Sequence, residues 1–231
     1  MTTSNFNFAS GEVLNINKPE GWSSFDVVKK VRYAAREKRV GHAGTLDPFA
    51  SGVLLVCTGS ATKQVSELMN FDKEYLAEIE FGKTTDTYDR TGVVLSETDT
   101  QSLEISEIKS SVQQFVGEIY QTPPMYSAIK VQGERLYKLA RRGEVIERAP
   151  RKIRIHELQV VGFTAAEKRA TLKVVCSKGT YIRSLAHDLG GRLGCGAYLS
   201  SLVRTRIGPH RIENAWTIDA LVASIHLSRQ V

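Results

Sequence analysis

The stretch from Gly41 to Gly52 constrains this chain more than any other, because three glycines and a proline interrupt it just before an apolar run. It reads Gly-His-Ala-Gly-Thr-Leu-Asp-Pro-Phe-Ala-Ser-Gly. Pro48 disfavours helix and restricts the residue before it to an extended backbone. The glycines allow conformations and close approaches that other residues cannot adopt. The stretch therefore predicts a stiff loop that presents one carboxylate, Asp47.

The segments on either side of this loop predict alternating strands and helices. Ser23 or Ser24 is placed to cap a helix that carries Phe25, Val28 and Val31 on one face. Val53–Cys57 is a continuous apolar run between glycines, which is typical of a buried strand. The loop with Asp47 is therefore expected to lead directly into core structure.

The second half of the chain continues the mixed pattern. Residues 75–81 alternate between apolar and polar side chains, which predicts a strand with Tyr75 near its start. Residues 105–116 predict an amphipathic helix, and 153–163 with 170–177 predict paired strands. Thr180 is expected to cap a further helix. Together these elements predict an α+β fold with a mixed, largely antiparallel sheet flanked by helices.

Positive charge is concentrated in one segment, residues 127–154. The whole chain has 31 Lys and Arg and 25 Asp and Glu; nine and three of these lie in this segment, which leaves 22 of each sign elsewhere. The entire formal excess of +6 therefore lies here. Such a patch indicates a binder of phosphate backbone, although a solvated basic face without a partner would look the same. Glycine and proline punctuation predicts a protruding, partly mobile insertion with a short helix at residues 136–142.

The rest of the composition is that of an ordinary globular protein, with 42% hydrophobic and 24% charged residues. No apolar run approaches the roughly 20 residues that a membrane span needs, and the first residues do not resemble a signal peptide. We therefore expect a cytoplasmic protein. Cys57, Cys176 and Cys195 lack metal-site spacing and are odd in number, so we expect buried, reduced thiols.

The loop sequence resembles the catalytic-aspartate motif of the TruB-type tRNA pseudouridine 55 synthases. A lone Asp-Pro pair is typical of a turn, but twelve residues in this order are far more specific. Further motifs of that family are matched in the same order, and the resemblance spans roughly residues 11–217. These matches are Asn17–Pro19, Lys73–Tyr75, Pro123–Ala128, Lys178–Leu185 and Leu199–Gly208.

The resemblance implies a pseudouridine-synthase fold that converts the T-loop uridine of tRNA, position 55, to pseudouridine. The base is flipped out, detached from its sugar, rotated and rejoined through carbon 5. Residues 1–231 would form a single catalytic domain, and about 125–154 would form a thumb-like RNA-binding insertion. Most bacterial members continue into a C-terminal PUA domain, whereas this chain resembles a short form without it.

The resemblance also implies three catalytic residues. Asp47 would be the nucleophile, a role that suits a carboxylate in splitting a glycosidic-type bond. Arg183 would keep Asp47 ionised and oriented. Tyr75 would stack on the flipped base and assist removal of the proton from carbon 5. On sequence alone, the simpler interpretation of Arg183 is a surface arginine, and that of Tyr75 is an aromatic residue of the core.

Residues that contact the RNA are implied in the same way. His42 would brace the space that the flipped base leaves behind, and Lys18 would bind a nearby phosphate. Tyr181 and Leu202 would form the pocket wall, or serve packing alone. The thumb-like insertion would position the RNA backbone through its basic side chains, among them Lys130, Arg141 and Arg142.

An isomerisation of this kind requires no cofactor and no metal, and we expect neither. The expected partner is tRNA through its T arm, with no membrane and with the protein as a monomer. Two alternatives stay open from the sequence. A nucleobase-cleaving hydrolase would use a similar carboxylate and release uracil, and a noncatalytic tRNA-folding chaperone would need binding but no nucleophile.

Overall fold

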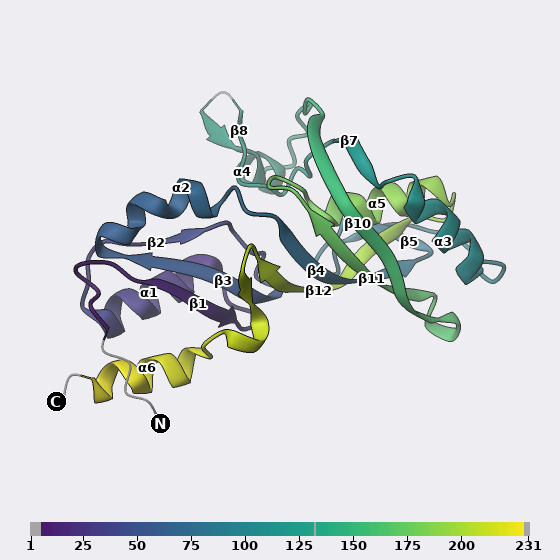
Figure 1. The fold of residues 1–231 in the computed structure, drawn as a ribbon. Helices are drawn as coiled ribbons and strands as arrows, with labels where there is room; N and C mark the ends of the chain where they lie inside the picture. The colour runs from purple at the N-terminus through teal and green to yellow at the C-terminus, as the bar shows by residue number, and fades with distance from the viewer. Residues whose placement is uncertain (1–5, 132, 229–231) are drawn as a thin grey trace. The chain divides into compact units, whose positions relative to one another are not determined.

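The computed structural model describes residues 6–131 and 133–228, which form two compact units. Unit 1 comprises residues 1–75 and 202–231, and unit 2 comprises residues 76–201. The sequence predicts one catalytic domain, and the assignment of both units to it stays a prediction. Strands β4 (Lys73–Phe81) and β12 (Ala197–Ile207) each contribute residues to both units. The elements are drawn in Figure 1, and each unit is described by itself.

Unit 1 is built around strand β3 (Ser51–Thr58). Strands β1 (Val13–Lys18) and β2 (Val40–Ala43) pair with it antiparallel, and the second half of β12 pairs with it in parallel. Residues 52–58 of β3 are all buried, because packed side chains cover both faces of the strand. The buried strand expected from the apolar run is therefore confirmed.

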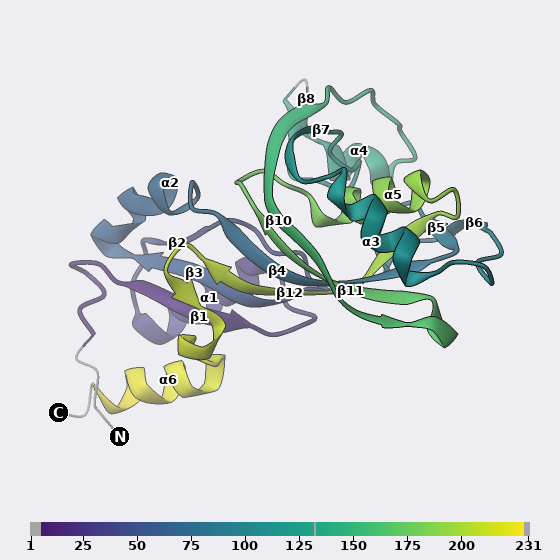
Figure 2. The same ribbon diagram turned by 45° about the vertical axis from the view of Figure 1, so that its right-hand side comes forward.

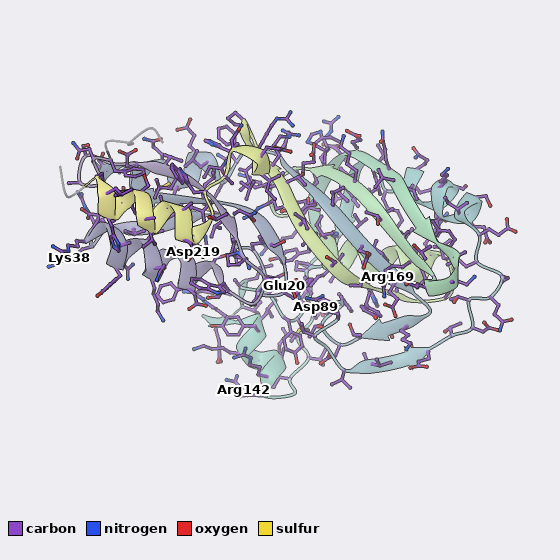
Figure 3. All side chains as sticks on the ribbon, turned by 90° about the horizontal axis from the view of Figure 1, so that it is seen from below. Glu20, Lys38, Asp89, Arg142, Arg169 and Asp219 are labelled. Atoms are coloured by element: carbon purple, nitrogen blue, oxygen red, sulfur yellow. The ribbon has the colours of Figure 1, made fainter. Side chains whose placement is uncertain are left out.

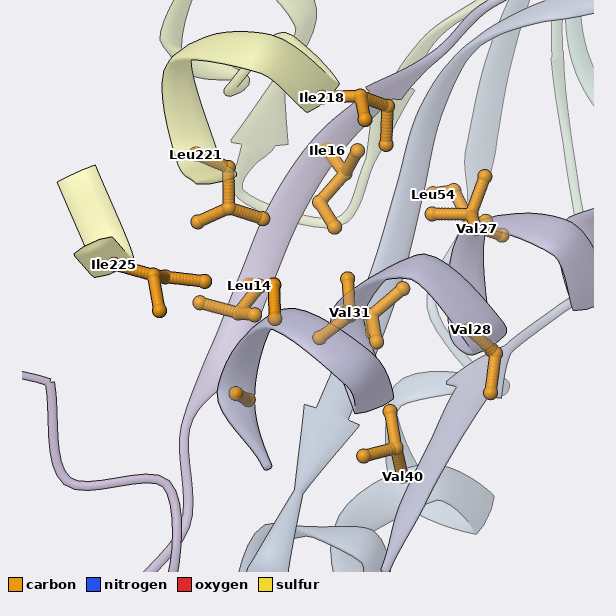
Figure 4. Packing of buried hydrophobic residues seen from close by; sticks show 13 residues of the cluster. Leu14, Ile16, Val27, Val28, Val31, Val40, Leu54, Ile218, Leu221 and Ile225 are labelled. Carbon is orange, nitrogen blue, oxygen red and sulfur yellow. The ribbon is translucent and has the colours of Figure 1, made fainter. Parts of the chain in front are cut away.

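Helices α1 (Ser24–Ala35) and α6 (Ile218–Leu227) share one apolar core with β1 and β3 in unit 1. Figure 4 shows this core, in which Val27 and Val31 of α1 lie with Leu14 of β1 and Leu221 of α6. Unit 1 also holds α2 (Val65–Leu68), β13 (His210–Arg211) and two short 3-10 segments at Gly59–Gln64 and Ile212–Asn214.

Ser23 caps α1 as the sequence predicts, and it forms a reciprocal capping box with Asp26. The expectation that Phe25 lies on the buried face was wrong, because its side chain is 52% exposed. The buried stripe of α1 instead consists of Val27, Val28, Val31, Ala34 and Ala35. Phe25 falls outside this stripe, and the helix turns its ring toward solvent.

Unit 2 contains a sheet in which β4, β11 (Arg169–Cys176), β10 (Arg151–Thr164) and β7 (Gly117–Gln121) follow one another. The long β10 pairs antiparallel with β11 and with β7. Helix α3 (Ile105–Gln113) contacts β10 and α5 (Ile182–Arg192), an arrangement that Figure 2 shows. The predicted strand pair and amphipathic helix are confirmed. Unit 2 also holds the first residues of β12 and the paired strands β5 (Lys83–Thr85) and β6 (Val94–Glu97).

The basic insertion folds around its own small cluster of Met125, Leu136 and Leu139. It contains the antiparallel pair β8 (Lys130–Val131) and β9 (Glu134–Arg135), followed by helix α4 (Leu136–Arg141). The short helix expected at residues 136–142 is confirmed with its end one residue earlier. This packing gives the basic side chains a folded support.

The three cysteines are buried and free, as expected. Burial raises the pKa of Cys57 to about 11, so that this group remains a thiol at neutral pH. Within the described residues, no helix combines the length and apolar character that a crossing of the membrane requires.

Candidate functional site

The loop that carries Asp47 connects β2 to β3 in unit 1, and Asp47 itself is half-buried. Gly44 and Gly52, at the two ends of the loop, have φ angles of +93° and +108°. These conformations strain any residue with a β-carbon. At Gly52 the cause is visible, because a β-carbon there would collide with the backbone of Arg204. The glycine pattern in the sequence therefore reflects two real backbone requirements.

Ser24, at the start of α1, holds the loop at Leu46, the residue before Asp47. The Ser24 hydroxyl accepts a hydrogen bond from the Leu46 N–H at 2.9 Å and donates one to the Leu46 carbonyl at 3.1 Å. The Gly21 N–H donates to the Pro48 carbonyl at 2.8 Å. Asp47 thus lies between two residues whose backbones are fixed to the same segment.

Lys18 is fully buried, with 0% exposure, at the end of β1. Its ammonium donates to the carbonyls of Pro19 at 2.8 Å and Trp22 at 2.6 Å, and more weakly to that of Pro48 at 3.4 Å. Burial lowers the pKa of Lys18 to about 8, and the nearby Asp47 carboxylate opposes this effect. The phosphate contact expected from the sequence is not supported, because the buried ammonium faces these three carbonyls rather than solvent.

A second buried cation, Arg204 of β12, holds the other side of the loop in unit 1 and is 2% exposed. Its guanidinium donates to the carbonyls of Val53 at 2.7 Å, Gly44 at 3.2 Å and Thr45 at 3.3 Å. The sequence reasoning did not single out this arginine. A usable signal was its position two residues after Leu202, which places both on the buried face of one strand.

The other unit 1 candidates occupy neighbouring strands of the same sheet. His42 lies on β2, where burial and then the charge of Arg204 lower its pKa, so that the ring is neutral at pH 7. Tyr75 on β4 and Leu202 on β12 are 8% and 5% exposed. Their burial is compatible with a pocket wall, and their contact with a base stays a prediction.

In unit 2, Arg183 occupies the first turn of α5 and is 5% exposed. It donates to the carbonyls of Thr87 at 3.1 Å and Tyr126 at 2.8 Å. Its Nε also lies 3.6 Å from the Oδ2 atom of Asp89, a residue labelled in Figure 3. Buried charges require such partners. The pairing of Arg183 with Asp47 stays a prediction.

Asp89 is a functional candidate that the sequence reasoning missed. It is 4% exposed, and its Oδ1 atom accepts hydrogen bonds from the Thr87 hydroxyl and from both the N–H and the hydroxyl of Thr91, at 2.6–2.9 Å. Its Oδ2 atom faces Arg183. The threonine-rich turn at residues 84–91 was the available signal, since it supplies these donors.

The predicted cap of α5 was wrong. Thr180 donates its hydroxyl to the Ser177 carbonyl, and the helix begins after Tyr181 without a side-chain cap. The buried amide of Gln121 replaces the cap, since it accepts from the Tyr181 N–H at 2.8 Å and donates to the Tyr181 carbonyl at 3.0 Å. This clamp comes from β7, distant in sequence, and it fixes the backbone of Tyr181 two residues before Arg183.

The candidate RNA contacts of the insertion differ in their surroundings. Lys130 and Arg141 are exposed, and the guanidinium of Arg141 lies 5.6 Å from the centre of the Tyr137 ring. Arg142 instead makes a two-pronged pair with Glu134 at 2.6 and 3.0 Å and a further bond to Glu144 at 2.6 Å. Two carboxylates therefore compensate the charge of Arg142, which braces α4 against β9.

Each unit thus contributes one chemically distinctive arrangement. Unit 1 presents a carboxylate, Asp47, on a loop that two buried cations and Ser24 hold through its backbone. Unit 2 presents a buried arginine held in a fixed orientation. Among the residues that the structure describes, no three His, Cys, Asp or Glu side chains form a group suited to a metal ion.

Comparison with known proteins accounts for nearly the whole chain. Residues 32–182 match the TruB family pseudouridylate synthase (N terminal domain), and residues 183–230 match the tRNA pseudouridylate synthase B C-terminal domain.

Individual relatives agree with this match. The chain is 49% identical over 207 residues to tRNA pseudouridine synthase B of Clostridium tetani, covering 90% of this chain and 71% of that protein. It is 42% identical over 220 residues to the protein of the same name from Phocaeicola vulgatus, covering 93% of each.

Solved structures show the same fold. A chain in the crystal structure of a Cbf5-Nop10-Gar1 complex superposes with a TM-score of 0.73 and 32% identity, covering 94% of this chain and 54% of that one. The structure of an H/ACA RNP bound to a substrate RNA containing 2'-deoxyuridine gives a TM-score of 0.72 and 28% identity, with 96% and 56% covered. The chain thus spans about half the length of these structural neighbours. On this evidence the predicted pseudouridine-synthase fold is confirmed, and the chain belongs to the TruB family of pseudouridylate synthases.

Proposed function

We propose that this protein isomerises a uridine of tRNA to pseudouridine, and that the target is the T-loop uridine at position 55. The observation that carries this proposal is the held loop around Asp47, in which Ser24, Lys18 and Arg204 all bind backbone atoms within two residues of Asp47. Such a loop presents a reactive group without reorganisation at the moment of reaction.

In the proposed reaction, the bond between N1 of uracil and C1′ of ribose breaks and a bond between C5 and C1′ forms. The proton on C5 is lost to solvent and N1 gains one, so the product is an isomer and nothing is oxidised. Asp47 forms the covalent bond to the nucleotide that permits this exchange, at C6 of the base or at C1′ of the sugar. Arg183 is proposed to keep Asp47 ionised, and Tyr75 to stack on the base.

The target base is stacked inside the RNA loop, so the enzyme must extrude it. We propose that the neutral ring of His42 fills the space left behind, while Leu202 and Tyr181 line the pocket. The exposed cations of the insertion, such as Lys130 and Arg141, position the backbone of the T arm. Lys18 is reassigned from a phosphate contact to holding the loop. We further propose that the protein acts as a monomer in the cytoplasm.

The test uses a T-arm stem-loop carrying tritium at C5 of the target uridine. Wild-type protein is expected to release tritium and form pseudouridine, whereas Asp47→Asn should do neither. The matched control is Asp219→Asn, because this carboxylate is exposed on α6 of the same unit (Figure 3). Tritium release by Asp47→Asn at the wild-type rate contradicts the assignment of Asp47 as the nucleophile. Free uracil would indicate a hydrolase, and tRNA folding without pseudouridine a chaperone.

A further inference from the structure

We propose that the exposed face of α1, together with the residues that flank this helix, is a second RNA-binding surface of the protein, formed by residues that precede the Asp47 loop in the sequence. The surface, called here the α1 face, consists of the exposed Phe25, Lys29, Lys30 and Tyr33 of α1, the half-buried Trp22 before the helix, and the exposed Arg36 and Lys38 after it. All of these residues belong to unit 1. The inference rests on the proposed function, since it names a further surface for the same RNA.

Exposed aromatic rings are the first observation. Tyr33 is 85% exposed and Phe25 is 52% exposed, although each sits on a helix that buries its valines. Lys29 lies between them at helical spacing, with its ammonium 5.0 Å from the centre of the Phe25 ring. Flat rings beside cations are the combination that binds bases and phosphates together.

The charge of this surface is the second observation. Lys29, Lys30, Arg36 and Lys38 are exposed, and Figure 3 shows Lys38 extending away from the ribbon. The same stretch has two acids, Asp26 and Glu37, and these four cations outnumber them. Asp26 accepts hydrogen bonds from the backbone and hydroxyl of Ser23, and Glu37 accepts from the Arg39 N–H and lies 3.8 Å from its guanidinium. The face therefore presents positive charge to a partner.

The shape of the surface is the third observation. A hollow of about 530 Å³ is lined by Trp22, Asp26, Lys29, Lys30 and Tyr33 together with Gly21. A second of about 660 Å³ has Tyr33, Arg36, Glu37, Lys38 and His226 in its lining, so cations outnumber the single carboxylate in each hollow. The Tyr33 ring lies at both hollows. Both hollows are wide open to solvent, so a base or a phosphate of an extended RNA strand reaches them without a change of the protein.

The surface begins at the catalytic loop within the same unit. Gly21, which also lines the first hollow, donates its N–H to the Pro48 carbonyl, and Ser24 binds Leu46 on the other side of Asp47. From there α1 extends over 12 residues, about 18 Å at 1.5 Å per residue. RNA that leaves the Asp47 loop along α1 therefore meets cations and rings over the length of several nucleotides.

RNA fits these observations better than a protein partner. A protein interface of this size normally has an apolar centre poor in charge, whereas here lysines surround each ring. Phosphates occur at every nucleotide, and every base offers a flat face to an exposed tyrosine. The proposed occupant is thus RNA bound through its backbone, with one base stacked on Tyr33.

The test measures the affinity for an unmodified, full-length tRNA transcript between 50 and 200 mM salt. Neutralising two phosphate contacts in Lys29→Gln/Lys30→Gln is expected to reduce the slope of log affinity against log salt by about 1.4–1.8. Over this fourfold range of salt, the variant should lose roughly tenfold less affinity than the wild type. Tyr33→Ala should weaken binding about fivefold or more, and Tyr33→Phe should restore it, because the ring is retained.

The matched control neutralises two exposed cations of unit 2, Lys109 on α3 and Arg192 at the end of α5. Lys109→Gln/Arg192→Gln should leave the slope unchanged. Circular dichroism checks that Lys29→Gln/Lys30→Gln is folded. If the folded variant has the salt slope and the RNA affinity of the wild type, the proposal is overturned, and the surface binds a protein partner or none. Binding is scored without catalysis, so a wild-type protein that forms no pseudouridine contradicts the proposed function separately.

Discussion

Ser24, the first residue of α1, and Leu46, the residue before Asp47, exchange two hydrogen bonds through a single hydroxyl. Both residues are buried. The start of the helix therefore satisfies the backbone of the Asp47 loop. The loop in turn satisfies the Ser24 hydroxyl, which would otherwise be buried without a partner.

Removing that hydroxyl is expected to damage stability and catalysis together. Ser24→Ala leaves the Leu46 N–H and carbonyl buried without this partner, at a cost of about 1–3 kcal/mol. The turnover number should fall more than the affinity for RNA, since the change displaces Asp47 rather than the binding surface. Ser23→Ala is the matched control, because it removes the α1 cap, worth about 0.5–2 kcal/mol, without touching the loop. Urea denaturation and single-turnover kinetics measure both effects, and equal turnover in the two variants would contradict this role of Ser24.

The buried pair of Arg183 and Asp89 should be far more sensitive than a surface pair. Asp89→Asn leaves the Arg183 guanidinium buried beside a neutral group, which should cost about 3–5 kcal/mol. Glu80→Gln breaks the pair with Arg169, whose side chain is 33% exposed, and should cost less than about 1 kcal/mol. Urea denaturation of the two variants provides the comparison. A loss for Asp89→Asn no larger than for Glu80→Gln would show that the buried pair contributes nothing to stability.

The two adjacent arginines of the insertion should differ in RNA binding. Arg141→Gln is expected to lower the salt slope of affinity for a T-arm stem-loop by about 0.7–0.9, the effect of one lost phosphate contact. Arg142→Gln should change the slope less, because Glu134 and Glu144 already compensate its charge. Filter binding at several salt concentrations distinguishes them. An equal change in slope would mean that Arg142 leaves its carboxylates to bind RNA.

Lys18 should make stability depend on pH in a specific direction. Its pKa is about 8 in the folded protein and 10.5 in an unfolded chain, so the unfolded chain binds more protons between these values. The contribution of Lys18 to the free energy of unfolding should therefore rise with pH across this window. This contribution is lowest below pH 8. Relative to Lys18→Met, the wild type should gain about 2 kcal/mol in unfolding free energy from pH 7 to pH 9.5. Guanidinium denaturation at both values tests this, and a constant difference would place the Lys18 pKa near its ordinary value.

Local signals in the sequence predicted the elements around Asp47 well. The loop around Pro48, the apolar run of β3 and the serine cap of α1 lie where the sequence predicts them. Strand β2 was missed, because Gly41–Ala43 of the expected loop pair with β3 instead. The family resemblance supplied the activity and the candidate residues, which these local signals alone could not give.

What the sequence did not predict depends on contacts between distant segments. Arg204 reaches Gly44 across about 160 residues, and Gln121 replaces the expected Thr180 cap of α5 from 60 residues away. Lys18 was expected to bind a phosphate, yet the fold surrounds its ammonium with carbonyls. Burial of a charged side chain is decided by what packs around it, which no local pattern records.

The division of unit 1 into two chain segments sets the order in which the protein can mature during synthesis. The first 75 residues leave the ribosome with the Asp47 loop, Ser24 and Lys18, but Arg204 follows only after residues 76–201 have been made. At about 5–20 residues per second, translation of that insert takes roughly 6–25 s. During this interval the loop lacks one of its two cationic anchors, so the nascent chain completes its catalytic loop only after the inserted unit has been synthesised.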